Sequence, residues 1–222
     1  MKKEMRPRDF HFHRMFGVRL GSAALAVVIF CGLLPAQFMV RQVNLTYLAR
    51  RADVIVQGRV RSVHREPLPG YPDIRTVRVT LDVEDMVRGP AGDTYSFREI
   101  LLGYRSREGK RGYQTGQRLF LFLPSPSQYG LSSPIGIEQG RFHIARADRG
   151  KATIANEYGN AGLFMNVERE ANREGVKLSR NQSLTAGIES GPVDLDAFVS
   201  LVKSLTSLPR IQWKQNSKNS SF

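Results

Sequence analysis

Apolar and polar residues alternate most regularly in the middle of the chain. Every second residue from Val77 to Val83 is apolar, and the residues between them are polar or charged. Successive side chains of a strand point to opposite faces, so this pattern predicts a strand with one buried and one solvated face. Strands of this kind are typical of antiparallel sheets. The turn-forming residues 88–90 are expected to end the strand.

Further short strands are expected on both sides of this one. Residues 118–123 (RLFLFL) have apolar side chains on both faces, which predicts a strand buried on both sides or lying in a barrel wall. Gly58 falls inside an alternating segment, where glycine usually marks a β-bulge or a tight bend. The other predicted strands are residues 53–64, 94–102, 133–138, 141–146 and 151–155.

Two helices are predicted at the ends of this strand-rich region. Asn44 can cap a short helix over residues 45–52, and Asp194 can cap a longer one that extends to residue 205. The longer helix carries an apolar stripe suited to packing on a sheet. The residues of the stripe are Leu195, Phe198, Val202 and Leu205.

Together these elements predict a mainly β fold. The expected architecture is a small antiparallel OB-like barrel or sandwich with a short N-terminal helix and a C-terminal packing helix, preceded by an apolar targeting helix. We expect the β-barrel domain over residues 41–165, and a polar linker with the C-terminal helix over residues 166–208. Residues 209–222, rich in Ser, Asn and Lys, are expected to form a disordered tail.

The first 40 residues have the order of a targeting segment. Residues 1–19 are basic, and residues 20–34 are apolar and uncharged. This order is typical of a cleaved secretory signal peptide. An uncleaved signal-anchor is the alternative, because residues 20–40 are close to the roughly 20 residues that cross a bilayer. Both alternatives place residues 41–222 outside the cytoplasm: periplasmic, secreted or membrane-anchored.

The chain is strongly basic, with a net charge of +13 in 222 residues. Over half of this charge lies at the two ends. Residues 1–19 hold six basic and two acidic side chains, and four basic side chains and no acidic one follow Asp196. A nucleic-acid-binding domain concentrates its charge on the folded surface. A targeting segment and a solvated tail fit the distribution better, so nucleic acid is not the expected partner.

Four segments together resemble a group of exported bacterial proteins. They are ADVIVQGRV at residues 52–60, and residues 76–89, 116–123 and 129–142. The resemblance implies a small β-barrel similar in outline to the OB and netrin-like folds, the latter also found in metalloproteinase inhibitors. It implies no established activity. Those inhibitors chelate zinc through an N-terminal cysteine, whereas the only cysteine here, Cys31, lies in the targeting segment.

Two histidines, His64 and His143, lie in the predicted domain. Neither has a second histidine at the spacing that metal sites use, so no metal or cofactor is expected. Histidines on strands are usually surface or packed residues, and a catalytic one needs an orienting group and a nucleophile beside it.

Two carboxylates, Asp82 and Glu84, are expected on the same solvated face of the predicted strand. A carboxylate pair can perform acid–base chemistry, so an enzyme of unrecognised type that uses both with His64 stays an alternative. Ion pairs with Arg59 or Arg61 of the neighbouring strand are the more ordinary role.

Basic and aromatic residues are interleaved between residues 104 and 118. Such loops can bind anionic polymers, and OB barrels often bind their ligands with loops of this kind. The leading hypothesis is therefore an exported, non-enzymatic binding domain for a protein or an anionic polymer. An inhibitor or accessory of an extracytoplasmic protease is an alternative suggested by the fold outline. The candidate ligand-binding residues are Tyr104, Arg105, Arg107, Lys110, Arg111 and Tyr113.

Overall fold

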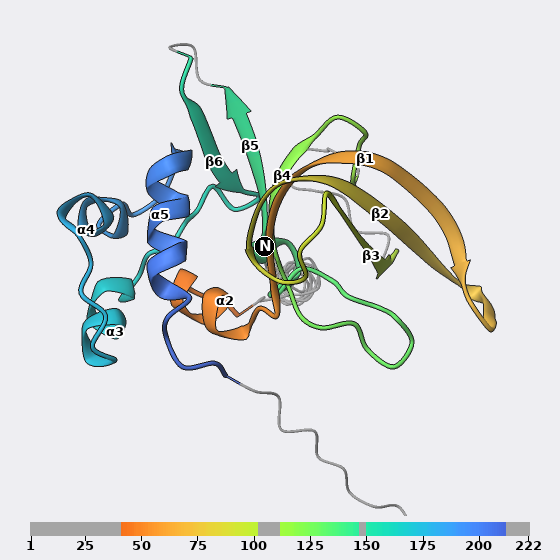
Figure 1. Ribbon diagram of the computed structural model, residues 1–222, viewed down its shortest axis with the longest axis horizontal. Coiled ribbons are helices and arrows are strands. Elements are labelled where there is room, and N and C mark those ends of the chain that lie inside the picture. Colours follow the sequence, from red (N-terminus) through yellow and green to blue (C-terminus); the bar gives the residue numbers. More distant parts are fainter. Residues whose placement is uncertain (1–40, 102–111, 147–149, 212–222) are drawn as a thin grey trace, which may run out of the picture. The chain divides into compact units, whose positions relative to one another are not determined.

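The computed structural model divides into two compact units, residues 1–40 and 41–222. The structure describes residues 41–101, 112–146 and 150–211, all in the second unit (Figure 1). The predicted targeting segment lies outside these residues, as does most of the predicted disordered tail. No helix in the described ranges is long and apolar enough to cross a membrane.

One seven-stranded antiparallel sheet forms the framework of the second unit, which confirms the expectation of a mainly β fold. The strands follow the order β3-β2-β1-β4-β5-β6-β7, so β3 and β7 are the two edges. No ladder within the described residues joins these edges, so the sheet is open. The strands are β1 (Val54–Leu68), β2 (Tyr71–Arg88), β3 (Thr94–Ile100), β4 (Arg118–Leu123), β5 (Arg141–Arg146), β6 (Ala152–Asn156) and β7 (Val193–Asp194).

The strand predictions are largely confirmed. Strands β4 and β5 have the expected bounds, and β1 and β2 are longer than expected because their ladder continues to a turn at Gly70. The strand predicted over residues 133–138 is wrong. Gly136 and Ile137 both have left-handed backbone conformations, with φ of 69° and 62°. They start the short 3-10 helix η1 (Ile137–Gly140) in place of an extended strand.

Gly58 marks the β-bulge that its position in the sequence predicts. The register between β1 and β2 shifts between Gln57 and Gly58. A Cβ atom at Gly58 would lie 2.5 Å from the backbone oxygen of Asp82. Only glycine therefore allows the two strands to approach this closely at the bulge.

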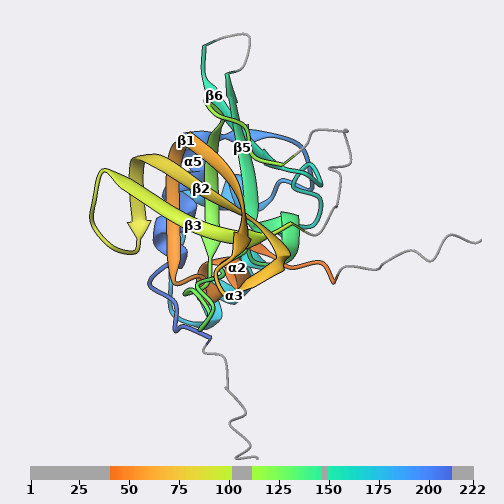
Figure 2. The same cartoon turned by 90° about the vertical axis from the view of Figure 1, so that its right-hand side faces the viewer.

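The bulged strands β1 and β2 curve so that β3 lies over one face of the sheet (Figures 1 and 2). The enclosed space holds a set of buried residues that we call the inner cluster. Alternate residues of β4 belong to it, which are Leu119, Leu121 and Leu123. The inner cluster consists of Val54, Val56, Val60, Val77, Val79, Leu81, Phe97, Leu119, Leu121 and Leu123.

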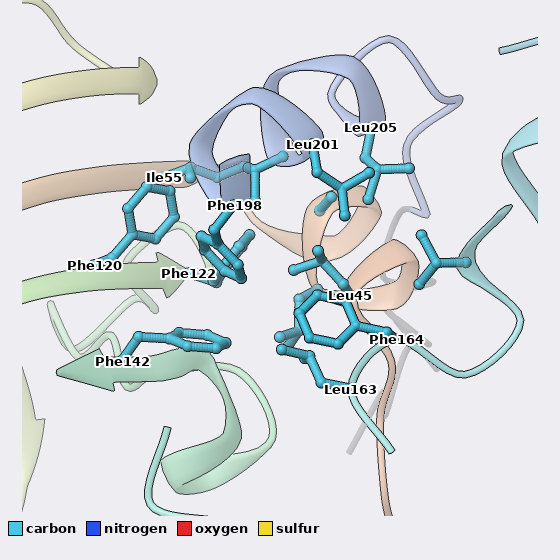
Figure 3. Packing of buried hydrophobic residues seen from close by; sticks show 14 of the residues in the cluster. Leu45, Ile55, Phe120, Phe122, Phe142, Leu163, Phe164, Phe198, Leu201 and Leu205 are labelled. Atoms are coloured by element: carbon cyan, nitrogen blue, oxygen red, sulfur yellow. The ribbon is translucent and has the colours of Figure 1, made fainter. Parts of the chain in front are cut away.

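The opposite face of the sheet packs against the helices. Phe120 and Phe122 of β4 point to this side, so β4 is buried on both faces, as its sequence predicts. The ring of Phe198 lies 5.4 Å from that of Phe120 and 5.1 Å from that of Phe142, between centroids (Figure 3). This helix-side cluster includes Leu45, Leu48, Ile55, Phe120, Phe122, Phe142, Phe164, Phe198, Leu201 and Leu205.

The two predicted helices are confirmed. Helix α2 (Leu45–Arg51) begins after Asn44, whose side chain accepts a hydrogen bond from the Tyr47 backbone nitrogen at 2.9 Å. Helix α5 (Leu195–Leu205) begins after Asp194, whose carboxylate accepts one from the Ala197 backbone nitrogen at 2.9 Å. Both caps satisfy backbone groups that the first helical turn leaves unpaired.

Two further helices lie in the stretch expected to be a polar linker. They are α3 (Val167–Arg173) and α4 (Arg180–Ala186). Val167 and Ala171 of α3 belong to the helix-side cluster, so this segment contributes to the same core. Ser179 and Gln182 form a reciprocal capping box at the start of α4.

The segment between β4 and η1 connects the curved edge strand to the middle of the sheet. The Ser132 backbone nitrogen donates to the Arg98 carbonyl of β3 at 2.8 Å. The Ile135 backbone nitrogen donates to the Phe122 carbonyl of β4 at 2.9 Å. Residues 131–135 therefore join β3 to the end of β4 through backbone hydrogen bonds.

Candidate functional site

Tyr113 is the one predicted ligand-binding residue that the structure describes. Its hydroxyl donates a 2.7 Å hydrogen bond to Glu99 of β3, and its ring packs edge-on against Phe97. The Arg141 guanidinium lies 4.8 Å from the centroid of the same ring. Tyr113 is thus held in place by three side chains. The other five candidates, Tyr104, Arg105, Arg107, Lys110 and Arg111, lie outside the described residues.

Arg141 lies at the centre of a buried group of ionisable side chains. Only 5% of its side chain is exposed. Its Nη2 lies 2.6 Å from the Glu138 carboxylate and 3.7 Å from the Glu157 carboxylate. Glu157 also lies 2.7 Å from the His143 Nε2. We call Glu99, Tyr113, Glu138, Arg141 and Glu157 the buried ionic cluster, which comes from β3, η1, β5 and two connecting segments.

The buried ionic cluster has more carboxylates than permanent cations, and this shifts its protonation. Burial raises the pKa of Glu99, partly offset by the Tyr113 hydrogen bond. Burial also raises the pKa of Glu138, and Arg141 opposes that rise. Burial and the adjacent Glu99 charge raise the pKa of Tyr113. Clusters with shifted pKa values occur at functional sites and in structural ion-pair networks alike.

The Glu99→Gln variant is expected to be more stable than the parent chain near neutral pH. A raised folded-state pKa means that the parent loses stability as pH rises through that pKa, because ionised Glu99 is disfavoured when buried. A tenfold difference in proton affinity between the folded and unfolded chain corresponds to about 1.4 kcal/mol. A glutamine oxygen still accepts the Tyr113 hydrogen bond. Urea unfolding between about pH 4 and pH 8 should show a gain that grows with pH.

The matched control for this measurement is Glu189→Gln, which neutralises an exposed carboxylate. Its unfolding free energy should follow that of the parent chain across the same pH range. A gain of equal size in both variants, or a gain for Glu99→Gln that does not change with pH, would contradict the role assigned to the burial of Glu99.

The strand carboxylates occupy ion pairs. Arg61 pairs with Asp82, as predicted, but the partner of Glu84 is Arg118 of β4 and not an arginine of β1. Hydrogen bonding to Arg118 lowers the pKa of Glu84. His64 lies opposite Arg78, which is four residues from Asp82 along β2, or about 13 Å at the rise of a strand. The structure therefore does not bring His64 to the two carboxylates.

A pocket of about 390 Å³ opens on the helix-side face of the sheet, where β1, β4 and β5 are neighbours. Arg59 and Arg118 lie directly opposite each other in the β1–β4 ladder. Arg146 ends β5 at the same pocket. We call this the arginine pocket. It is lined by Arg59, Gly116, Gln117, Arg118, Ile144 and Arg146.

A wider open groove continues from the arginine pocket along α5. Its volume is about 910 Å³, and Arg118 lines both hollows. Lys203 of α5 forms an ion pair with Asp85 of β2 at 2.9 Å in this groove. Gln57 donates to Glu84 at 2.9 Å beside it. Asp196 adds a second carboxylate to the lining of the groove, so the groove lacks the excess of positive charge found among the residues that line the arginine pocket.

Comparison of the chain with protein-family models, with curated proteins and with solved structures finds no match. The described residues contain no group of three or more His, Cys, Asp or Glu side chains that could hold a metal ion. The geometry of the arginine pocket and of the buried ionic cluster is therefore the basis for any functional argument.

Proposed function

We propose that residues 41–222 are an exported, non-enzymatic binding domain whose ligand is an anionic polymer. The observation that carries the proposal is the arginine pocket. Residues 116–118, at the end of the basic and aromatic segment, line it together with Arg59 and Arg146. The excess of positive charge at this pocket suits an anionic ligand, and the basic and aromatic residues that precede it in the sequence suit a ligand that is a polymer.

The proposal includes a barrel of OB outline for the strands β1 to β4. Two backbone hydrogen bonds support it, those from Ser132 to Arg98 and from Ile135 to Phe122, because they link the edge strand β3 back to β4 through residues 131–135. The inner cluster is then the barrel core. OB barrels bind ligands with the loops and strand faces around such a core.

Export is the second part of the proposal and rests on the order of residues 1–40. Expression of the full chain in a bacterial host, followed by fractionation and mass measurement, tests it. A periplasmic or secreted species starting near Gln37 is the expected result for a signal peptide, and a membrane-bound species retaining residues 1–40 is expected for an anchor. Accumulation of the uncleaved chain as a cytoplasmic protein would contradict export.

Binding is tested on that mature species with inorganic polyphosphate as the probe. Replacing Arg105, Arg107, Lys110 and Arg111 with serine is expected to weaken binding about tenfold or more at physiological salt, because phosphate contacts dominate such affinities. The matched control removes the same charge elsewhere, with Arg65, Arg75, Arg169 and Lys177 replaced by serine. These four are exposed, and no ion pair joins them to the described residues. Equal losses in both variants would contradict a localised binding surface.

A further inference from the structure

Of the three guanidinium groups at the arginine pocket, that of Arg118 alone forms an ion pair within the described residues. Arg118 binds Glu84 through Nε, at 2.9 and 3.0 Å, and through Nη2, at 2.5 Å. Arg59 donates to the Gly116 carbonyl at 3.1 Å and has no ion pair within the described part of the chain. Arg146 has no ion pair with the described residues either. Counted over the described residues, three guanidinium groups thus face one carboxylate at the pocket, an excess of two positive charges.

Like charges directly opposite each other in a ladder, such as Arg59 and Arg118, destabilise a sheet. Nearby carboxylates reduce this repulsion only in part. Asp82 lies opposite Arg59 in the β1–β2 ladder but pairs with Arg61. Glu84, which also lies near Arg59, is hydrogen-bonded to Arg118. Glu84 keeps the Arg118 guanidinium in a fixed orientation. The Nη1 atom of Arg118 makes no hydrogen bond to the described residues. An external anion would remove the excess charge and would find donors already in place.

The chemistry of the pocket favours one kind of anion. Guanidinium groups bind phosphate oxygens with paired, charge-assisted hydrogen bonds. A terminal or free phosphate group carries up to two negative charges near neutral pH, and two adjacent internal phosphates of a polymer carry two together, which matches the two unbalanced arginines. A volume of about 390 Å³ accommodates such a group together with part of the molecule that carries it. Ile144 supplies an apolar wall at the same place.

We propose that Arg59, Arg118 and Arg146 form a binding site for a phosphate group. This inference rests on the proposed function, since it names the group by which the anionic polymer is recognised. Arg59 and Arg146 supply the two unbalanced charges, and Arg118, oriented by Glu84, supplies the third guanidinium.

The test measures binding of inorganic phosphate and of inorganic polyphosphate to the full chain by calorimetry. The double variant Arg59→Ser/Arg146→Ser is expected to weaken binding of both probes about tenfold or more, the scale of one lost charge-assisted hydrogen bond. The matched control is Arg65→Ser/Arg75→Ser, which removes two exposed arginines of the β1–β2 hairpin outside the pocket. It should change either affinity less than about twofold, as expected for exposed charges under screening.

A third variant, Glu84→Gln, shifts affinity in the opposite direction. It removes the negative charge that competes for Arg118, while the glutamine oxygen can still accept a hydrogen bond from that guanidinium and keep its orientation. Phosphate binding should therefore tighten about threefold to fivefold, as expected for an exposed ion pair. Weakening of polyphosphate binding alone by the double variant would also support the site, and would show that it recognises phosphate within a chain.

Three results would overturn the proposal. One is an equal effect of the double variant and its control. Another is weaker phosphate binding in Glu84→Gln. The third is polyphosphate binding that the pocket variants leave unchanged. In the third case, loss of binding in the variant with Arg105, Arg107, Lys110 and Arg111 replaced would still uphold the proposed function.

Discussion

The Asn160→Ala variant is expected to unfold with a free energy about 3 kcal/mol or more below that of the parent chain. Asn160 is fully buried, and its side chain makes three hydrogen bonds to backbone groups. Its Oδ1 accepts from the Asn156 nitrogen at 3.0 Å, and its Nδ2 donates to the carbonyls of Ile154 and Gly191 at 3.1 and 2.9 Å. Removing the amide leaves these groups unsatisfied, at about 1–3 kcal/mol each where no water replaces it.

The backbone conformation of Asn160 contributes a second, smaller cost. Its φ of 57° lies in the left-handed region, which asparagine tolerates better than alanine. Asn166 has nearly the same φ, 62°, but its side chain is exposed and makes no capping hydrogen bond to α3. Asn166→Ala therefore isolates the backbone cost, which should be about 1 kcal/mol. Urea unfolding of both variants measures the difference.

The side-chain network around Asn160 joins three parts of the chain. Asn156 ends β6, and its own amide donates to the Gln139 carbonyl of η1 at 3.2 Å. Gly191 precedes β7, so Asn160 connects the edge of the sheet to the segment that leads into α5. If Asn160→Ala and Asn166→Ala lose the same stability, the network contributes nothing measurable and this account is wrong.

The Arg88→Met variant is expected to lose about 3 kcal/mol of stability. Arg88 is the last residue of β2, and its guanidinium donates to three backbone carbonyls at the ends of two helices. Nη1 donates to Ala49 and Ala52 at 2.6 and 2.8 Å, and Nη2 donates to Thr206 at 2.9 Å. Methionine keeps the apolar stem but leaves the carbonyls of α2 and α5 without this cation.

Arg88→Lys is the conservative variant, and it should recover part of the loss because an ammonium group also donates to carbonyls, though without the planar fork. Arg75→Met is the control for exchanging an exposed arginine of the same strand. Amide hydrogen exchange should show faster opening of α2 and α5 in Arg88→Met. Equal stability of Arg88→Met and Arg75→Met would contradict the role of Arg88 at the two helix ends.

Sequence patterns found the helices that begin with a cap and have an apolar stripe, but missed α3 and α4. Each of these has seven residues, as α2 has, but lies in a polar stretch with too few apolar residues to show a helical period. One signal was present: Ser179 and Gln182 have the spacing of a capping box. The rest of their stability comes from contacts such as those of Val167 with the helix-side cluster, which no local pattern contains.

The candidate site, too, was only partly predictable from the sequence. The basic and aromatic character of residues 104–118 is visible in the sequence and led to the arginine pocket through residues 116–118. Arg59 and Arg146 have no such signal, because each is an ordinary charged residue of a strand. Arg141 starts a strand in the same manner, and only its neighbours across the fold show that it is buried.

The sequence by itself determined the mainly β class, the strand that is buried on both faces, the bulge at Gly58 and the two capped helices. These depend on alternation, chain stiffness and hydrogen bonds within a few residues. The tertiary structure decided the order of the strands, the curvature that brings Glu99 of β3 to Tyr113 and Arg141, and the meeting of three arginines in one pocket. Those features depend on sheet twist and on pairing between residues far apart in the chain, so local sequence patterns do not predict them.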